Sequence, residues 1–354
     1  MQPRSKRGRG ALSNQTGRYQ TETRALDDDG WGNLENLPDA LPTSLAVDFA
    51  KTVISYNTSP DVPFDRSINP YRGCEHGCVY CFARPSHAYL GLSAGLDFET
   101  KLFYKPDAPE RLKLELSTRH YRPAPMALGI NTDAYQPIER KLILTRQLLE
   151  VLSQTRHPVS IVTKSALIER DLDILTAMAA QDLVQVALSI TTLNSELARK
   201  LEPRAPAPKR RLQTVAALAA AGVPVSVLVA PLIPVVNDAE LEAILRQARL
   251  AGALDAGYVL LRLPLELKDL FSEWLQHHEP LKADHVLQRI YDSRGGKLYD
   301  SGFGSRMTGT GLYADMIKQR YRLAMKKLGF PGMPEFNISA FSPFRLAGQM
   351  DLFD

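Results

Sequence analysis

The chain has 354 residues, of which 44% are hydrophobic and 23% are charged, so it can bury a large core and is neither wholly disordered nor collagen-like. Its 43 Lys and Arg against 39 Asp and Glu give a formal net charge of +4, which alone indicates no class of partner. It contains three cysteines, too few for a disulfide framework at this length. All three lie within eight residues of one another, which makes them the leading feature.

The first 24 residues are basic. One acid, Glu22, stands against six cations, which are Arg4, Lys6, Arg7, Arg9, Arg18 and Arg24. Because no apolar stretch follows them, this segment is not a secretory signal. We expect a solvated, disordered leader, and we expect residues 1–65 as a whole to be irregular. A basic arm that contacts nucleic-acid phosphates is the alternative.

The stretch between Arg211 and Asp238 carries no charge, which is typical of a membrane segment. It is interrupted by one glycine and three prolines, which are Gly222, Pro224, Pro231 and Pro234. An Ala-rich helix over 208–221, a glycine stop and a buried strand over 223–230 explain it better. We therefore expect no membrane association and a cytoplasmic, reducing environment.

From residue 67 onward, short apolar runs alternate with helical patterns, which is typical of repeated βα units. Six strands are expected, over residues 67–71, 126–130, 159–163, 184–190, 223–230 and 257–263. Helices are expected around them, over residues 108–116, 138–154, 169–180, 195–200, 209–221 and 239–251. The pattern predicts an α/β fold, a partial (β/α)6 TIM-like barrel over residues 66–265, with its chemistry at the C-terminal ends of the strands.

The pattern changes after the sixth strand. Residues 267–278 and 280–292 are expected to be helical, a glycine-rich loop follows, and a basic helix is expected over 315–328. We therefore predict a mainly helical C-terminal extension over residues 266–345. A flexible tail is expected over residues 346–354.

Cys74, Cys78 and Cys81 form a C-x3-C-x2-C motif on a short loop that also contains Gly73 and Gly77. Thiolates at this spacing can wrap one face of a cubane iron–sulfur cluster, and the glycines let the backbone approach it closely. A four-iron cluster needs four ligands, and the chain has no fourth cysteine. The motif therefore predicts a 4Fe–4S cluster with one iron open to a non-protein ligand.

A structural zinc ion is the main alternative for these cysteines, with His76 or His87 as the fourth ligand. A zinc site, however, would not require the barrel pattern that follows the motif. The cysteines could also be ordinary buried residues, which their clustering disfavours.

The cysteine spacing, with the aromatic residue Tyr80 just before the last cysteine, resembles the signature of the radical S-adenosylmethionine superfamily. The resemblance spans residues 67–264 and agrees with the count of βα units. It implies that the open iron binds the amino and carboxylate groups of S-adenosylmethionine. One electron from the cluster would cleave the sulfonium to methionine and a 5′-deoxyadenosyl radical, which abstracts hydrogen from the substrate. An external electron donor, flavodoxin or ferredoxin, is also implied.

The same resemblance implies which residues hold S-adenosylmethionine. The end of the second strand, with Asn131, Thr132 and Asp133, would meet the amino group, and Lys164 would meet the carboxylate. Contacts to the ribose, the adenine or the carboxylate are implied for four further residues, which are Ser189, Thr191, Tyr80 and Arg262. The local alternatives are a helix cap for Asp133, a solvated side chain for Lys164 and backbone hydrogen bonds for Ser189.

Within the superfamily, the chain resembles the subgroup related to spore photoproduct lyase, which reverses a thymine-dimer lesion in DNA. The shared motifs are NPYRGCEHGCVYCFAR at 69–84, NTDAYQP at 131–137 and TKS at 163–165. That enzyme uses an additional cysteine near the end of the second strand as hydrogen donor, and this chain has none there. Either another donor serves, for which Tyr135 is the catalytic candidate, or the substrate differs. We expect a lyase- or transferase-like enzyme with an unknown substrate.

The chain ends in Gln-Met-Asp-Leu-Phe-Asp, which resembles the Gln-x-Asp-Leu-Phe peptide that docks many bacterial DNA-repair and replication proteins on the sliding clamp. Gln349 would make polar contacts, while Leu352 and Phe353 would enter an apolar pocket. The alternative is a short amphipathic end that folds back on the barrel.

The last predicted helix is basic, with Lys318, Arg320, Arg322, Lys326 and Lys327. Together with the leader and the tail, it favours DNA or another nucleic acid as substrate or platform. The alternative for this helix is a solvated amphipathic face with Ile317, Tyr321 and Met325 packed inward. Two other classes of protein also stay open: a non-catalytic iron–sulfur redox sensor and a zinc-stabilised DNA-binding adaptor.

Overall fold

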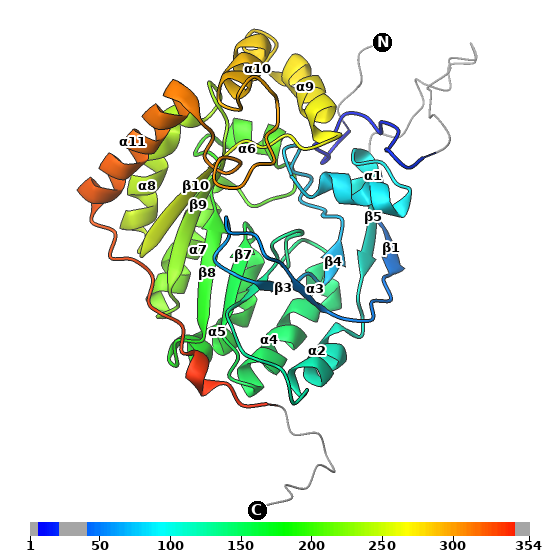
Figure 1. Ribbon diagram of the computed structural model, residues 1–354, viewed down its shortest axis with the longest axis vertical. Helices are drawn as coiled ribbons and strands as arrows, with labels where there is room; N and C mark the ends of the chain where they lie inside the picture. The colour runs from blue at the N-terminus through cyan, green and yellow to red at the C-terminus, as the bar shows by residue number, and fades with distance from the viewer. Residues whose placement is uncertain (1–5, 21–40, 344–354) are drawn as a thin grey trace, which may run out of the picture.

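A seven-stranded sheet lies at the centre of the computed structural model, which describes residues 6–20 and 41–343 (Figure 1). Six of its strands are parallel and follow one another across the sheet in chain order: β3 (Arg66–Ile68), β6 (Met126–Leu128), β7 (Val159–Thr163), β8 (Val184–Ser189), β9 (Val225–Leu232) and β10 (Asp255–Leu260). The seventh strand, β2 (Ile54–Tyr56), pairs antiparallel with β3. Strands β10 and β2 are the two edges, so the sheet is open, and the predicted α/β fold with a partial barrel is confirmed.

The parallel strands form because their apolar residues can be covered on both faces. In β7, Val159 and Ile161 are fully buried, and the alternating Ser160 and Val162 are half-buried. Burying one such Val or Ile side chain contributes about 1.5–3 kcal/mol. An aspartate in place of Ile161 would therefore place an unpaired charge in the core.

The helices of the βα units follow the predicted stretches with two changes. Their bounds are α2 (Ala108–Leu116), α3 (Glu139–Leu142), α4 (Leu144–Gln154), η2 (Ala166–Asp171), α5 (Leu172–Ala179), α6 (Ser195–Leu201), α7 (Pro208–Ala220), η3 (Asp238–Glu240) and α8 (Leu241–Leu250). The single helix expected over 138–154 is two helices, because Ile143 adopts a left-handed conformation with φ 57°. The helix expected over 169–180 is also divided. Its first residues belong to the 3-10 helix η2, and the rest form α5.

A second sheet of three short strands lies beside the barrel, in the order β1 (Ser44–Val47), β5 (Lys101–Tyr104) and β4 (Tyr71–Arg72). The strand expected over 67–71 is therefore split between two sheets. Pro70 separates the two parts, because proline has no amide to donate to a ladder. The turn η1 (Arg84–Leu90) and helix α1 (Leu96–Thr100) complete this region.

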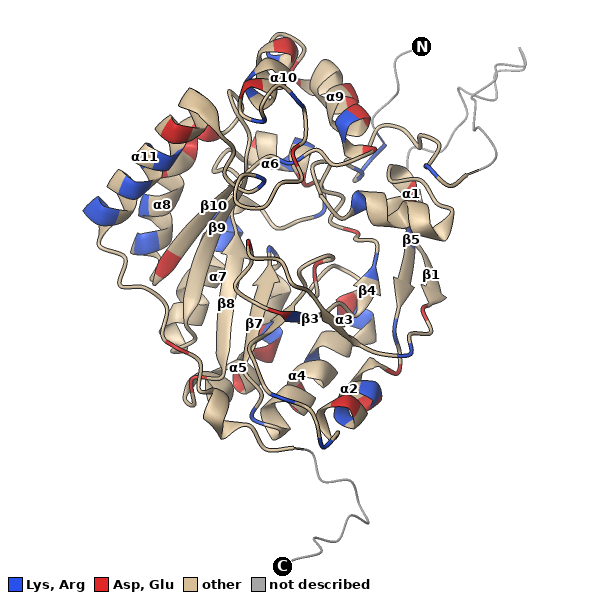
Figure 2. Cartoon of the chain, viewed as in Figure 1, with Lys and Arg blue, Asp and Glu red and all other residues tan. Residues whose placement is uncertain are grey.

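The C-terminal extension is helical, with α9 (Leu267–His278), α10 (Ala283–Asp292), α11 (Gly311–Leu328) and the short turn η4 (Ile338–Ala340). Helix α11 packs on α8, with Ile317 buried and Arg320 bonded to Glu242 at 2.7 Å. Tyr321 and Met325 also pack inward, so this helix is amphipathic, and its other cations lie on the outer face (Figure 2).

After α11 the chain returns along the sheet to the N-terminal ends of the strands (Figure 1). The Asn337 amide donates to the Asp182 carbonyl before β8, and the Ser342 amide donates to the Thr155 carbonyl before β7. This segment therefore covers one end of the barrel, and the C-terminal ends of the strands lie at the other. Among the described residues, no helix is both long and apolar enough to cross a bilayer.

The expectation of a solvated leader is wrong for residues 9–12. Arg9, Ala11 and Leu12 are buried, because the segment packs against α1 and the cysteine loop. Residues 1–5 and 21–40 of the predicted leader lie outside the described residues, and so does the stretch 344–354 with Gln349, Leu352 and Phe353.

Candidate active site

The three cysteines follow β4 on a tightly turned loop near the C-terminal end of β3. Cys74 and Cys78 are buried, and Cys81 is half-buried. Gly73 and Gly77 have φ of 77° and 68°, in the left-handed region that favours glycine. A Cβ on Gly73 would lie 2.8 Å from the Phe98 carbonyl oxygen, so no side chain fits there.

The donor set of this loop fits an iron–sulfur cluster. Burial raises the pKa of the Cys74 thiol well above its ordinary value and that of Cys78 to about 12. A metal coordinates the thiolate form and so offsets the cost of burying these groups. In a cubane, each cysteine binds a different iron, so the three sulfurs need not meet at one point.

The geometry does not favour a single zinc ion. Among residues 6–20 and 41–343, no group of three or more His, Cys, Asp or Glu side chains is placed to hold one metal ion. His87 Nε2 lies 2.9 Å from the Lys101 carbonyl, and His76 Nδ1 lies 3.3 Å from Asp133 Oδ2 without the alignment of a hydrogen bond. His76 Nδ1 therefore faces Asp133 and His87 Nε2 faces the backbone, while His87 Nδ1 has no hydrogen-bond partner among the described residues.

Asp133 connects three elements of the site. Its carboxylate accepts hydrogen bonds from Thr163 Oγ1 at 2.6 Å, from the Lys164 amide at 2.9 Å and from the Tyr135 amide at 2.9 Å. Burial alone would raise the pKa of Asp133, but the neighbouring His76 and these bonds hold it well below its usual range. Asp133 does not cap a helix, because its bond to Tyr135 closes a turn ahead of α3. Its role is to join the ends of β6 and β7 to the cysteine loop.

Lys164 places a cation beside the cysteines. Its Nζ lies 5.6 Å from the centre of the Tyr80 ring and 3.9 Å from Glu202 Oε1. Burial alone would lower the pKa of Lys164, but the nearby Cys78 and Asp133 raise it above its ordinary value. The side chain is therefore a largely covered cation beside the cysteines, with 15% of its area exposed, rather than a freely solvated strand end.

Two buried residues that sequence analysis did not single out complete this network. The Tyr80 hydroxyl donates to Glu202 Oε1, and the Arg211 guanidinium pairs with Glu202 Oε2. Thr191 Oγ1 donates to the same carboxylate at 2.7 Å. Glu202 follows α6 and Arg211 lies on α7 in no recognisable motif, so only the fold brings them to Tyr80.

The remaining residues expected at the strand ends are largely bonded to backbone. Ser189 Oγ donates to the Ala230 carbonyl at 3.1 Å, as its alternative reading predicted, and Thr132 Oγ1 donates to the Tyr71 carbonyl at 2.7 Å. Asn131 is exposed, and its backbone amide donates to Asn69 Oδ1 at 2.9 Å. Of these three side chains, only that of Asn131 is open to solvent.

Arg262 and Tyr135 have different surroundings. The Arg262 guanidinium lies 5.4 Å from the ring centre of Phe82, the residue after Cys81, and its buried Nε has no partner among the described residues. Tyr135 is fully buried, and its hydroxyl donates to Asp171 Oδ2 at 3.1 Å. Burial and Asp171 raise the pKa of Tyr135 well above its ordinary value. The structure therefore brings Arg262 to the cysteine loop and directs Tyr135 to Asp171.

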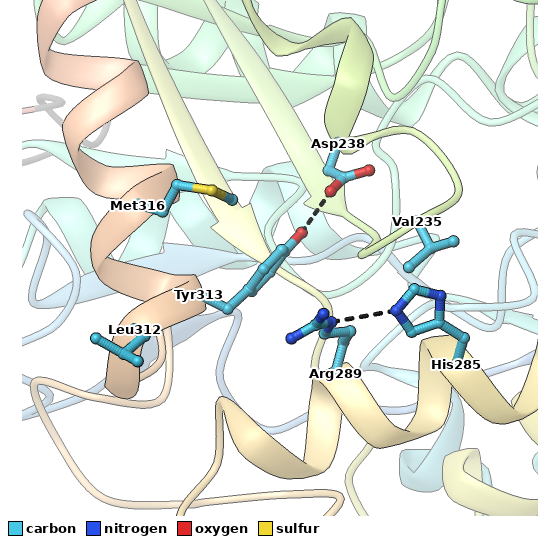
Figure 3. Close-up of a pocket in the computed structure, with 7 residues that line it drawn as sticks. All are labelled: Val235, Asp238, His285, Arg289, Leu312, Tyr313 and Met316. Carbon is cyan, nitrogen blue, oxygen red and sulfur yellow. Dashed lines mark hydrogen bonds between the residues drawn. The ribbon is translucent and has the colours of Figure 1, made fainter.

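A surface pocket of about 400 Å³ lies between α10, α11 and the loop after β9 (Figure 3). The Tyr313 hydroxyl donates to Asp238 at 2.7 Å, and Arg289 Nε donates to His285 Nε2 at 3.2 Å. None of the site residues expected from the sequence lines it. This pocket is separate from the cysteine loop.

The fold and the loop together define a protein with a partial barrel and a three-cysteine motif near the C-terminal ends of its strands. The family model of the radical SAM superfamily matches residues 68–248, about half of the chain. The chain belongs to this superfamily of enzymes, as the cysteine motif predicted.

Curated relatives share this part of the chain. An uncharacterized protein of Mycobacterium tuberculosis is 38% identical over 221 residues, which are 62% of this chain and 65% of the relative. An uncharacterized protein of Methanocaldococcus jannaschii is 28% identical over 173 residues, 49% of this chain and 62% of the relative. The chain thus spans just under two thirds of the length of the relatives it matches.

Solved structures of spore photoproduct lyase variants have a similar fold. One gives a TM-score of 0.58 at 18% identity and covers 81% of this chain and 80% of that chain. Another gives a TM-score of 0.59 at 15% identity and covers 89% of this chain and 87% of that chain. A third, with bound AdoMet and dinucleoside spore photoproduct, gives 0.58 at 16% identity and covers 81% and 80%. At these identities the likeness shows the fold alone, and it agrees with the predicted subgroup.

Proposed function

We propose that this protein reductively cleaves S-adenosylmethionine with a 4Fe–4S cluster held by Cys74, Cys78 and Cys81, and that it abstracts hydrogen from a substrate. The observation that carries the proposal is the cysteine count. All the thiols of the chain lie on one glycine-containing loop, and three ligands leave one iron of a cubane open. When bound, the cluster supplies one electron and S-adenosylmethionine supplies the group that abstracts hydrogen.

The surrounding residues are suited to hold the second cofactor. Lys164 is a cation for its carboxylate, and Asn131 offers polar groups in an exposed turn at the end of β6. The Tyr80 ring, on the cysteine loop, lies 5.6 Å from Lys164 Nζ and its hydroxyl is held by Glu202, so an adenine can pack beside it. Arg262 has a buried nitrogen that needs an acceptor.

The substrate we propose is a nucleic acid, and the fold shared with spore photoproduct lyase supports this class. The chemistry at the substrate differs from one that uses a cysteine hydrogen donor, because all three cysteines are assigned to the cluster. Since Tyr135 bonds to Asp171, its role as donor would require that bond to break.

The test is made on anaerobically purified protein. We expect about four irons per chain after reconstitution, a brown visible spectrum and release of 5′-deoxyadenosine with reductant and S-adenosylmethionine. Replacing any one of the three cysteines with alanine should abolish this release. Colourless, zinc-loaded protein would support the adaptor class instead, and an iron–sulfur protein that releases no 5′-deoxyadenosine would support the sensor class.

The substrate class is tested with S-adenosylmethionine turnover in the presence of deuterated damaged DNA, RNA or peptide pools. Deuterium in the 5′-deoxyadenosine identifies the pool that donates hydrogen. We expect DNA or RNA to do so, and transfer from peptides alone would contradict a nucleic-acid substrate. Comparing flavodoxin with ferredoxin as reductant in this assay identifies the electron donor.

We also propose that the terminal peptide with Gln349, Leu352 and Phe353 binds a bacterial sliding clamp. Its support is the Gln-x-Asp-Leu-Phe pattern alone. Binding is measured for the full chain and for a chain that ends at residue 348. Equal affinity would dismiss the clamp as a partner.

A further inference from the structure

One carboxylate holds residues 9–14 against the cysteine loop. Glu99, in the last turn of α1, is fully buried. Its Oε2 accepts a hydrogen bond from the Gly10 amide at 3.0 Å, and its Oε1 accepts one from the Ala11 amide at 2.8 Å. The Arg9 guanidinium donates to the Glu99 carbonyl at 2.8 Å and is itself buried. The segment is therefore tied to α1 by charge-assisted bonds.

The same carboxylate pairs with Arg84, which is also fully buried. Arg84 Nε donates to the Cys78 carbonyl at 2.8 Å, and Nη2 donates to the Gly77 carbonyl at 3.2 Å. One ion pair thus connects the N-terminal segment to the backbone that carries the cysteines. Removing either partner of such a pair leaves an uncompensated buried charge.

Gly10 and Gly77 bring the two backbones into direct contact. A Cβ on Gly10 would lie 1.9 Å from the Gly77 carbonyl oxygen and 3.3 Å from the Val79 amide nitrogen. A Cβ on Gly77 would lie 2.8 Å from Glu99 Oε2. No side chain fits between the segment and the loop, so this contact excludes water.

The far end of the segment is anchored elsewhere. The Ser13 hydroxyl donates to Glu273 Oε2 on α9 at 2.7 Å, and the Leu96 amide donates to the Ser13 carbonyl at 3.2 Å. Asn14 exchanges two bonds with Asp97, at 2.9 and 3.0 Å. The segment therefore spans from the cysteine loop to the C-terminal extension.

We propose that residues 9–14 form a strap that fixes the cysteine loop from outside and shields the cluster from water and oxygen, with Glu99 and Arg84 as positioning residues. The shielding role rests on the proposed cluster. The hold on the loop does not, because it is made entirely by residues of the chain. Releasing the strap therefore loosens residues 74–84 with or without metal.

The experiment compares Gly10→Val and Glu99→Gln with the wild-type chain. The matched control is Glu169→Gln, which removes a carboxylate that pairs with Arg210 on the helical side of the barrel, at 2.6 Å. Two quantities are measured: amide hydrogen exchange of residues 74–84 in cluster-free protein, and the lifetime in air of the visible absorbance of loaded protein. We expect both exchange and bleaching to be at least about tenfold faster in the two variants, and unchanged in the control.

Amide hydrogen exchange of residues 74–84 at the wild-type rate in both variants would overturn the proposal that the strap fixes the cysteine loop. Faster exchange with an unchanged lifetime of the absorbance overturns the shielding role. If Glu99→Gln loses its helical circular dichroism, Gly10→Val decides, since Gly10 lies outside the barrel. If the wild-type chain binds no iron, the proposed function fails, and the exchange measurement on cluster-free protein still decides the hold on the loop.

Discussion

The Lys164 ammonium is a largely covered cation beside the cysteine loop and is our candidate for the cofactor carboxylate, so its removal separates cofactor binding from cluster binding. In Lys164→Met we expect an unchanged iron content and affinity for S-adenosylmethionine at least about tenfold weaker, because one charge-assisted bond is lost. Equilibrium binding to the loaded protein measures this.

The control for this prediction is Lys318→Met, which removes an exposed lysine from α11. Its affinity should equal that of the wild-type chain. Equal affinity in Lys164→Met would instead contradict the assignment of Lys164 to the cofactor.

A second single-residue prediction concerns His157 and acid stability. His157 is buried, its Nε2 lies 2.7 Å from the Tyr121 hydroxyl, and its Nδ1 lies 2.9 Å from the Pro158 carbonyl, which together fit the neutral ring. Burial lowers the pKa of His157 to about 4. The unfolded chain therefore takes up this proton first, and stability is lost as the pH falls from the ordinary histidine pKa toward 4.

Between pH 7 and pH 5 this group should remove about 2 kcal/mol from the free energy of unfolding. Urea denaturation of cluster-free protein at both pH values measures the loss. In His157→Gln the loss should be smaller by that amount, and in His120→Gln, which changes an exposed histidine, it should equal the wild-type loss. An equal loss of unfolding free energy between pH 7 and pH 5 in the wild-type chain and in His157→Gln would contradict the assignment of this loss to His157.

The site could be predicted from the sequence only where residues carry a local pattern. Cys74, Cys78 and Cys81 have a fixed spacing, and Lys164 directly follows a buried strand, so the sequence alone indicates both as candidates. Glu202 and Arg211 have no such pattern, because their pairing depends on how α6 and α7 pack together over Tyr80. Tyr135 lies in the turn between β6 and α3 rather than directly after a strand, and it faces Asp171, since the direction of a side chain in a turn is set by its packing.

At the level of elements, the end of α7 is a motif that the glycine stop predicted. The Gly222 amide donates to the Ala219 carbonyl and the Val223 amide to the Leu218 carbonyl, which is the Schellman pattern. Gly222 has φ 75°, and a Cβ there would meet no atom within 4 Å. Any cost of a side chain at this position therefore comes from the backbone conformation alone.

Gly222→Ala should lower the free energy of unfolding by about 1 kcal/mol, because alanine is strained in the left-handed region. Thermal unfolding measures the change. The comparison is Gly302→Ala, whose glycine does not have positive φ and whose Cβ would meet only the side chains of Asp300 and Ser305, at 3.1 and 3.3 Å, so its midpoint should stay close to that of the wild type. Equal midpoints for both variants would mean that the C-terminus of α7 relaxes at no cost.

The burial of a strand, and its distance along the chain from the strand that it pairs with, explain which elements could be predicted from the sequence. No residue of the six parallel strands is exposed and most of their residues are apolar, so their pattern is independent of their partners. The second sheet is different, because β1 is exposed along its length and pairs with β5 more than fifty residues away, from Ser44 with Lys101 to Val47 with Tyr104. Nothing local marks such strands. The buried leader residues escaped prediction for the same reason.

In the whole molecule, two described segments outside the βα units, residues 9–14 and 330–343, pack on the barrel. Residues 9–14 lie on the cysteine loop, and residues 330–343 run under the N-terminal ends of the strands. There Phe341 packs against the rings of Tyr121 and His157, at 5.6 and 5.5 Å between ring centres. The C-terminal segment thus packs against the core from outside through the half-buried Phe330, Ala340 and Phe341, although its sequence has no periodic pattern.

Removing residues 330–343 should therefore destabilise the barrel from the end opposite the site. A chain that ends at residue 329 loses the core contacts of the half-buried Phe330 and Phe341, worth about 1–2 kcal/mol each, and the backbone bonds to Asp182 and Thr155. Against a chain that ends at residue 343, its unfolding midpoint should be lower by at least about 5 °C. Because the cysteine loop lies at the other end, the iron content of the folded protein should be the same in both. Equal midpoints would show that the barrel closes without this segment, and a loss of iron at an unchanged midpoint would show that the segment acts on the site itself.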